Sequence, residues 1–97
     1  MIQSNLDAVL RAIDAGAGND LDDLLTVVRQ PSISAQQVGV RECAMLVREF
    51  MNGAGLETRL LETRGEPMVL GTWLEAGPDK PTILFYGHYD VQPPEPL

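Results

Sequence analysis

The pattern of apolar and polar residues changes from a helical period in the first half of the chain to a strand-like period in the second. Apolar residues recur three and four positions apart in two short stretches before Pro31 and in a longer stretch after it. Gly16 and Gly18 are expected to end a first short helix. Asn19 or Asp20 can cap a second helix, which Pro31 prevents from continuing.

The third helical stretch is the longest. From about Gln36, apolar residues at positions 40, 43, 44, 47, 50, 51 and 54 form one face, which we interpret as core packing on a sheet. Ser34 and Gln37 have the spacing of a capping box, and Gly53 and Gly55 stand at the far end. The sequence therefore predicts a helix that starts near Gln36 and stops near Gly53.

After Gly55 the period becomes that of strands. Residues 56–62 and 68–75 are separated by the turn-forming TRGEP, which predicts a hairpin or near-hairpin. Residues 82–86, after the turn AGPDKP, form a continuous apolar run typical of a strand that is buried on both faces. Helices followed by such strands predict an α/β fold with three layers, helix/sheet/helix, in a single domain that leaves at least one sheet edge open.

Composition narrows the classes of function. The 97 residues carry a formal net charge of −7, the wrong sign for binding a nucleic-acid backbone. No apolar run approaches the roughly 20 residues that span a bilayer, and the start lacks a secretion signal, so we expect a cytoplasmic protein without a membrane partner. Cys43 is the only cysteine and lies in the helical apolar pattern, which indicates a buried, reduced thiol.

The candidate chemistry lies at the end of the last predicted strand. His88, the only histidine, is two residues from Asp90, so both side chains project from one face if the strand continues. A carboxylate that accepts one ring N–H of an imidazole fixes the tautomer in which the other nitrogen binds a metal. Without further context, the same pair can be a hydrogen bond with no catalytic meaning.

Two other sites can be built from the same pair. A serine triad would add Ser32 or Ser34, but neither serine lies in a nucleophile elbow. A weak site for a single metal would add Glu95. A catalytic zinc needs about three protein ligands, which this chain can supply only with carboxylates.

The stretch TILFYGHYDVQPPEPL as a whole resembles the first metal-binding motif of the M20 family of metallopeptidases, which includes acylases, desuccinylases and carnosinase-like dipeptidases. The matching features are the apolar strand and Gly87, His88, Asp90, Val91 and Pro93. Tyr89, Gln92 and the final PPEPL resemble the dipeptidase branch. Upstream, LDDLLTVVRQPSISAQ resembles the early helix and loop of the family, so the resemblance covers about residues 20–97.

The resemblance implies a hydrolase with two zinc ions that acts on small peptides. In the family, the histidine matching His88 binds one metal, and the aspartate matching Asp90 is a catalytic residue that orients it. The metal pair polarises an amide carbonyl and activates a bridging water. The later motifs of the family have no match here, so residues 1–97 are expected to be the incomplete amino-terminal portion of one catalytic domain, without a second domain and inactive alone. The alternative is a non-catalytic α/β module that binds a partner or forms a homo-oligomer through its open sheet edge.

Overall fold

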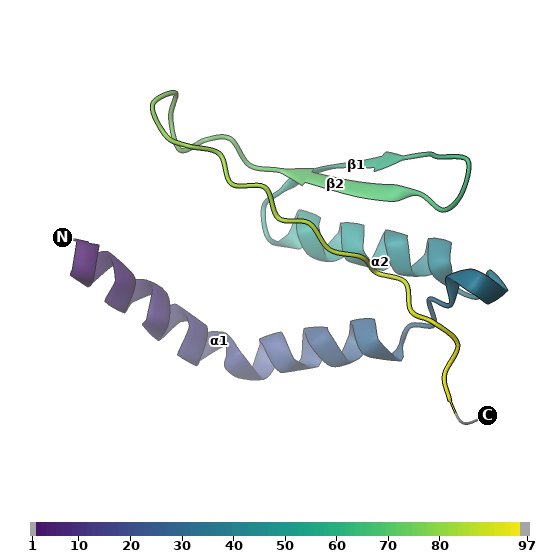
Figure 1. Cartoon of the computed structure of the whole chain (residues 1–97). Helices are drawn as coiled ribbons and strands as arrows, with labels where there is room; N and C mark the ends of the chain where they lie inside the picture. Colours follow the sequence, from purple (N-terminus) through teal and green to yellow (C-terminus); the bar gives the residue numbers. More distant parts are fainter. Residues whose placement is uncertain (1, 96–97) are drawn as a thin grey trace.

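The computed structural model describes residues 2–95 and shows a small α/β module of two α-helices and a two-stranded sheet (Figure 1). Its elements, in chain order, are α1 (Ile2–Arg29), a 3₁₀ turn η1 (Ser34–Gln36), α2 (Val40–Gly53), β1 (Glu57–Leu61) and β2 (Met68–Thr72). Residues 73–95 follow without a helix or a further strand. No helix in the described range is both long and apolar enough to cross a membrane.

One continuous helix replaces the two helices that were predicted before Pro31. α1 runs through Gly16 and Gly18, and neither glycine has the positive φ that ends a helix. A glycine inside a helix costs only about 1 kcal/mol relative to alanine, so the prediction of a break was wrong. Figure 1 shows that α1 changes direction near its middle. Gly16 and Gly18 are near the middle of its sequence, Ile2–Arg29. α1 ends at Arg29, shortly before Pro31 as predicted.

The loop between the helices is built differently from the prediction. α2 begins at Val40 and not near Gln36, and no side chain caps it. The predicted capping box of Ser34 and Gln37 was wrong, because Ser34 starts η1 and Gln37 has φ of 55°. The residue before α2 is Gly39, with φ of 70°. A Cβ at Gly39 would lie 2.2 Å from the carbonyl oxygen of Pro31, so this close approach requires glycine.

The core lies where α2 packs on the hairpin. Val40, Cys43 and Ala44 are buried on α2, and the helix contacts both strands. β1 and β2 pair antiparallel with Leu61 opposite Met68, which confirms the predicted hairpin with slightly shorter strands.

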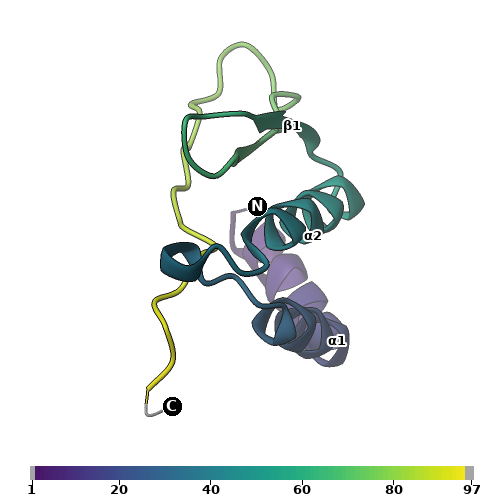
Figure 2. The ribbon, with the colours of Figure 1, turned by 90° about the vertical axis from the view of Figure 1, so that its right-hand side faces the viewer.

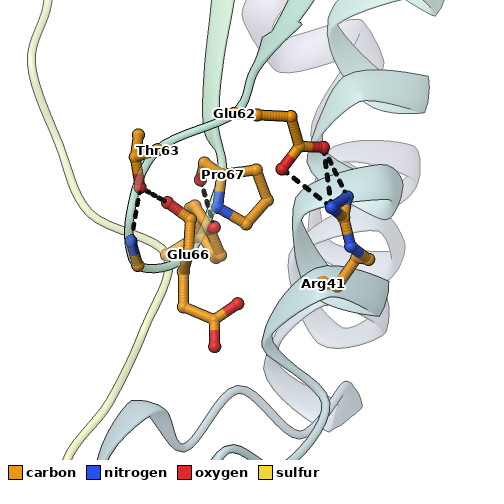
Figure 3. Close-up of polar contacts among 7 residues, drawn as sticks. Arg41, Glu62, Thr63, Glu66 and Pro67 are labelled. Carbon is orange, nitrogen blue, oxygen red and sulfur yellow. Dashed lines mark hydrogen bonds and ion pairs between the residues drawn. The ribbon is translucent and has the colours of Figure 1, made fainter.

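Two sets of polar contacts hold the turn end of the hairpin (Figure 3). The Arg41 guanidinium of α2 donates hydrogen bonds to both carboxylate oxygens of Glu62, at 2.6–2.9 Å. Within the turn, the Thr63 hydroxyl donates to the Glu66 carbonyl at 2.7 Å and accepts from the Gly65 N–H at 3.0 Å. These contacts tie the start of α2 to the end of β1 and order the connection to β2.

The layers are stacked in the order α1, α2, hairpin, and both helices lie on the same side of the two strands (Figures 1 and 2). The predicted three-layer helix/sheet/helix arrangement is therefore not confirmed. Residues 82–86 are extended but belong to no strand, so the prediction of a buried third strand was wrong for the described residues. A continuous apolar run indicates burial only when neighbouring strands are present to cover it.

Candidate functional site

His88 and Asp90 contact each other, as their spacing predicted. Nδ1 of His88 lies 2.8 Å from the backbone carbonyl oxygen of Asp90 and 3.1 Å from its carboxylate Oδ1. The His88 side chain is 74% exposed and that of Asp90 42% exposed. The pair therefore lies at the surface, where a ligand can approach the imidazole directly.

The contacts of the imidazole decide its tautomer. A backbone carbonyl can only accept a hydrogen bond, and so can an ionised carboxylate, so Nδ1 of His88 carries the proton that both oxygens of Asp90 accept. The lone pair of a neutral His88 is then on Nε2. This is the arrangement in which a carboxylate presents the second ring nitrogen of a histidine to a metal and increases its basicity.

Asp90 is itself held by Ser34. The Ser34 hydroxyl donates to Oδ2 of Asp90 at 2.6 Å, across 56 positions of sequence. This hydrogen bond lowers the pKa of Asp90, an effect that partial burial opposes and that the Asp90 backbone and His88 reinforce. Asp90 thus stays ionised with one carboxylate oxygen on Ser34 and the other on His88.

The backbone on either side of Asp90 is fixed by three separate parts of the fold. The Val91 N–H donates to the Ser32 carbonyl at 2.7 Å, and Ile33 forms a parallel bridge with Val91. The Cys43 thiol of α2 lies 3.8 Å from the carbonyl oxygen of Tyr89. The loop before α2 and α2 itself therefore position the chain that carries the pair.

The phenol of Tyr89 provides the third attachment. It donates a hydrogen bond to the carbonyl of Pro67, the residue just before β2. Burial raises the pKa of Tyr89, and the nearby negative charge of Glu66 raises it further. The neutral phenol therefore anchors residue 89 to the hairpin.

The described residues do not complete any of the alternative sites. No group of three or more His, Cys, Asp or Glu side chains within residues 2–95 is arranged to hold a metal ion, so Glu95 does not join His88 and Asp90. Ser34 donates to Asp90 and not to the imidazole, which is the wrong order for a serine triad. Cys43 is 1% exposed and free, as predicted for a buried reduced thiol.

Sequence reasoning identified the pair but not the residues that support it. Ser34 had been considered as a helix cap and as a nucleophile but not as a partner of Asp90, and the contacts of Tyr89 with Pro67 and Cys43 were not anticipated. No spacing rule connects positions so far apart in the chain. The stretch LDDLLTVVRQPSISAQ, which contains Ser34 and resembles an early helix and loop of the M20 family, was the one signal that could have pointed toward this residue.

Comparison with known proteins gives one partial match. The chain is 31% identical over 70 residues to a succinyl-diaminopimelate desuccinylase of Halorhodospira halophila (strain DSM 244 / SL1). The match covers 72% of this chain and 17% of the desuccinylase, so the chain spans about a sixth of the length of this relative. No protein-family model and no solved structure matches the chain. Because desuccinylases are among the M20 enzymes that the sequence resembles, the match supports the M20 family and a hydrolase, and it does not support the dipeptidase branch.

Proposed function

We propose that residues 1–97 are the amino-terminal portion of the catalytic domain of an M20-type metallopeptidase, in the dipeptidase branch, and carry the first ligand of its two-zinc site. The observation that supports the proposal is the chain of contacts from Ser34 to Asp90 to Nδ1 of His88, which leaves Nε2 as the ring nitrogen that would bind a metal. The partial similarity to a desuccinylase supports the same family.

In this proposal each residue has a separate task. His88 supplies the ligand atom Nε2, and Asp90 orients the ring by holding the proton on Nδ1. Ser34 fixes the Asp90 carboxylate and keeps it ionised. One imidazole does not satisfy a zinc ion, which takes about three protein ligands in a catalytic site. The described residues therefore do not fit a complete zinc site, and no chemical step follows from them alone.

Two substrate classes are supported by different observations. Tyr89, Gln92 and the residues around Pro93 and Pro94 resemble the dipeptidase branch, which favours hydrolysis of the peptide bond of small peptides. Residues 96–97, which complete that pattern, lie outside the described range. The similarity to a succinyl-diaminopimelate desuccinylase favours a second candidate, removal of a succinyl group from an amino acid. Both reactions cleave an amide bond, but in different substrates. An assay that compares a dipeptide with a succinylated amino acid therefore distinguishes the two candidates.

The first test is zinc titration of the purified chain by calorimetry, with a dipeptide-hydrolysis assay on the same sample. We expect no zinc binding in the micromolar range and no turnover. Binding in that range that is lost in His88→Ala would show that the chain completes a site unaided, which contradicts the proposal.

The positive test is a chimera in which residues 1–97 replace the corresponding part of the Halorhodospira halophila desuccinylase, to which the chain is 31% identical over 70 residues. We expect His88→Ala to remove bound zinc and activity, and Asp90→Asn to lower zinc affinity or activity by roughly 10–100-fold. Lys80→Ala, which changes an exposed residue away from the pair, is the matched control. A folded chimera in which His88→Ala keeps full zinc content and activity would refute the assignment.

A further inference from the structure

Tyr89 is the first half-buried residue after a long exposed stretch of the chain. Residues 73–88 are all exposed, whereas Tyr89 is partly covered. Within the described part of the chain, no backbone hydrogen bond joins residues 81–88 to either helix or to the hairpin. Because His88 lies at the end of this unattached stretch, its position depends on the contacts that residues 89–91 make.

The side chain of Tyr89 makes a different contact from the two residues on either side of it. The imidazole of His88 contacts Asp90, with Nδ1 3.1 Å from the carboxylate Oδ1. The phenol of Tyr89 instead donates a hydrogen bond to the carbonyl of Pro67. The backbone that joins His88 to Asp90 is therefore attached to the fold by the side chain between them.

The acceptor of this hydrogen bond is held in place. Pro67 is buried, and its ring restricts the backbone dihedral angle φ. The next residue, Met68, begins β2. The Thr63 hydroxyl makes two hydrogen bonds inside the hairpin turn, which we define as residues 62–67 (Figure 3). The phenol thus joins Tyr89 to an ordered part of the fold.

This contact links the candidate site to a part of the fold that its other contacts do not reach. Among the described residues, the Tyr89 phenol makes the one hydrogen bond between residues 87–91 and the hairpin. The other contacts of this segment reach α2 and the loop before it, where the partners are Cys43, Ser32 and Ser34. Without the phenol contact, residues 87–91 would be held from one side only.

The hydrogen bonds of the His88 ring depend on the backbone at residue 89. Nδ1 lies 2.8 Å from the backbone carbonyl oxygen of Asp90 and 3.1 Å from Oδ1 of its carboxylate. Both oxygens belong to a residue two positions along the chain, so rotation of the backbone at residue 89 changes both distances. Hydrogen bonds weaken steeply as their geometry departs from the optimum. A side chain that fixes residue 89 therefore also stabilises the tautomer with the proton on Nδ1.

We propose that Tyr89 is a positioning residue of the candidate site, which couples the hairpin turn to the orientation and tautomer of the His88 ring. The hairpin turn is then part of the structure that presents Nε2. Tyr89 is not a catalytic residue in this assignment, because its hydroxyl is engaged by Pro67. The consequence for metal binding rests on the proposed function, whereas the effect on the imidazole does not.

The first experiment measures the tautomer of His88 in the zinc-free chain by ¹⁵N NMR at about pH 8, where an ordinary imidazole is neutral. His88 is the only histidine, so the spectrum reports a single ring. We expect Nδ1 to carry the proton in the unmodified chain. Tyr89→Phe keeps the aromatic ring but removes the hydroxyl. It should shift the tautomer ratio toward Nε2–H by about two- to tenfold, the range that corresponds to one ordinary hydrogen bond.

Tyr86→Phe is the matched control for this experiment. It removes the same hydroxyl from a tyrosine that is 92% exposed, so it should leave the tautomer ratio unchanged. Circular dichroism of each variant checks that the helices are intact. A folded Tyr89→Phe chain with the tautomer ratio of the unmodified chain overturns the inference.

A double-mutant cycle tests whether the effect passes through the hairpin turn. Thr63→Ala removes the two hydrogen bonds of the Thr63 hydroxyl and should shift the tautomer ratio in the same direction as Tyr89→Phe. In a chain that already carries Tyr89→Phe, it should have little further effect. Equal shifts in both backgrounds overturn the inference, as does a Thr63→Ala chain without any shift. The Thr63→Ala result decides the question even where Tyr89→Phe does not fold.

The desuccinylase chimera tests the consequence for zinc. Tyr89→Phe should lower the zinc affinity of the chimera by about two- to tenfold, which is less than the effect of Asp90→Asn, and Tyr86→Phe should leave it unchanged. A tautomer shift without any loss of zinc affinity overturns the role in metal binding. A proton on Nε2 in the unmodified chain would contradict the proposed function as well, whereas an Nδ1 proton that Tyr89→Phe leaves in place contradicts this inference alone.

Discussion

Replacing Gly39 by alanine should be among the most destabilising single-methyl changes in this chain. Gly39 has φ of 70°, a conformation that costs an ordinary residue about 1–2 kcal/mol. The new Cβ would also lie 2.2 Å from the carbonyl oxygen of Pro31, which must move by roughly 1 Å to reach van der Waals contact. Together these effects predict a loss of about 2–4 kcal/mol in the free energy of unfolding, a large share of the roughly 5–15 kcal/mol that stabilises a typical domain.

The same substitution should reach the candidate site. Ser32 follows Pro31 directly, and its carbonyl accepts the Val91 N–H at 2.7 Å. Displacement of Pro31 should therefore weaken the attachment of residues 89–91 to the loop. We expect the amide of Val91 to lose protection in hydrogen exchange before α2 does.

The assay is urea denaturation followed by circular dichroism, with Gly53→Ala as the control. A Cβ at Gly53 meets no atom within 4 Å, and Gly53 does not have positive φ. The control should be neutral or gain about 0.4–1 kcal/mol, because alanine restricts the unfolded chain. If Gly39→Ala lost no more stability than Gly53→Ala, the argument from the left-handed conformation and the Pro31 contact would be refuted.

Three further predictions concern charged and polar contacts. Ser34→Ala should raise the pKa of Asp90 toward its ordinary value. The ionised carboxylate stabilises the fold above about pH 4, and in the variant this contribution should be lost at a higher pH as the solution is acidified. A carbon-detected NMR titration measures the pKa, and an unchanged value would contradict the Ser34 contact. The raised pKa of Tyr89 means that the folded chain holds the phenol proton more tightly than the unfolded chain, so stability should fall as the pH rises above about 10. Denaturation of Tyr89→Phe at several pH values should show a smaller fall. The Arg41–Glu62 ion pair is more than half exposed, so a double-mutant cycle should give a coupling of at most about 1 kcal/mol that decreases with salt, and a larger coupling would indicate a buried network.

Where a strong local period had a partner to pack on, the sequence predicted the fold correctly. The apolar face at positions 40, 43 and 44 became the buried side of α2, and the TRGEP turn became the connection of a hairpin. The prediction failed where the local sequence signals contribute little free energy. Gly16 and Gly18 did not end α1. Ser34 and Gln37 did not cap α2, because the loop before α2 is fixed by the close approach of Gly39 to Pro31.

The candidate site shows the same division. The contact of His88 with Asp90 follows from their spacing of two residues, so it could be predicted. The Ser34 contact could not be predicted in this way, because it depends on how the loop before α2 meets a segment 56 positions later. The apolar run at 82–86 indicated a strand, but periodicity does not show whether neighbouring strands are present.

The burial of Cys43 gives the chain an internal reporter of local opening. Its thiol is 1% exposed and faces the backbone of Tyr89, so a thiol reagent reaches it only when α2 and residue 89 separate. Because Cys43 is the only cysteine, the labelling rate is a single signal that needs no engineered probe. That rate, compared with the rate for an unfolded chain, gives the opening equilibrium of the region that holds the His88–Asp90 pair in place.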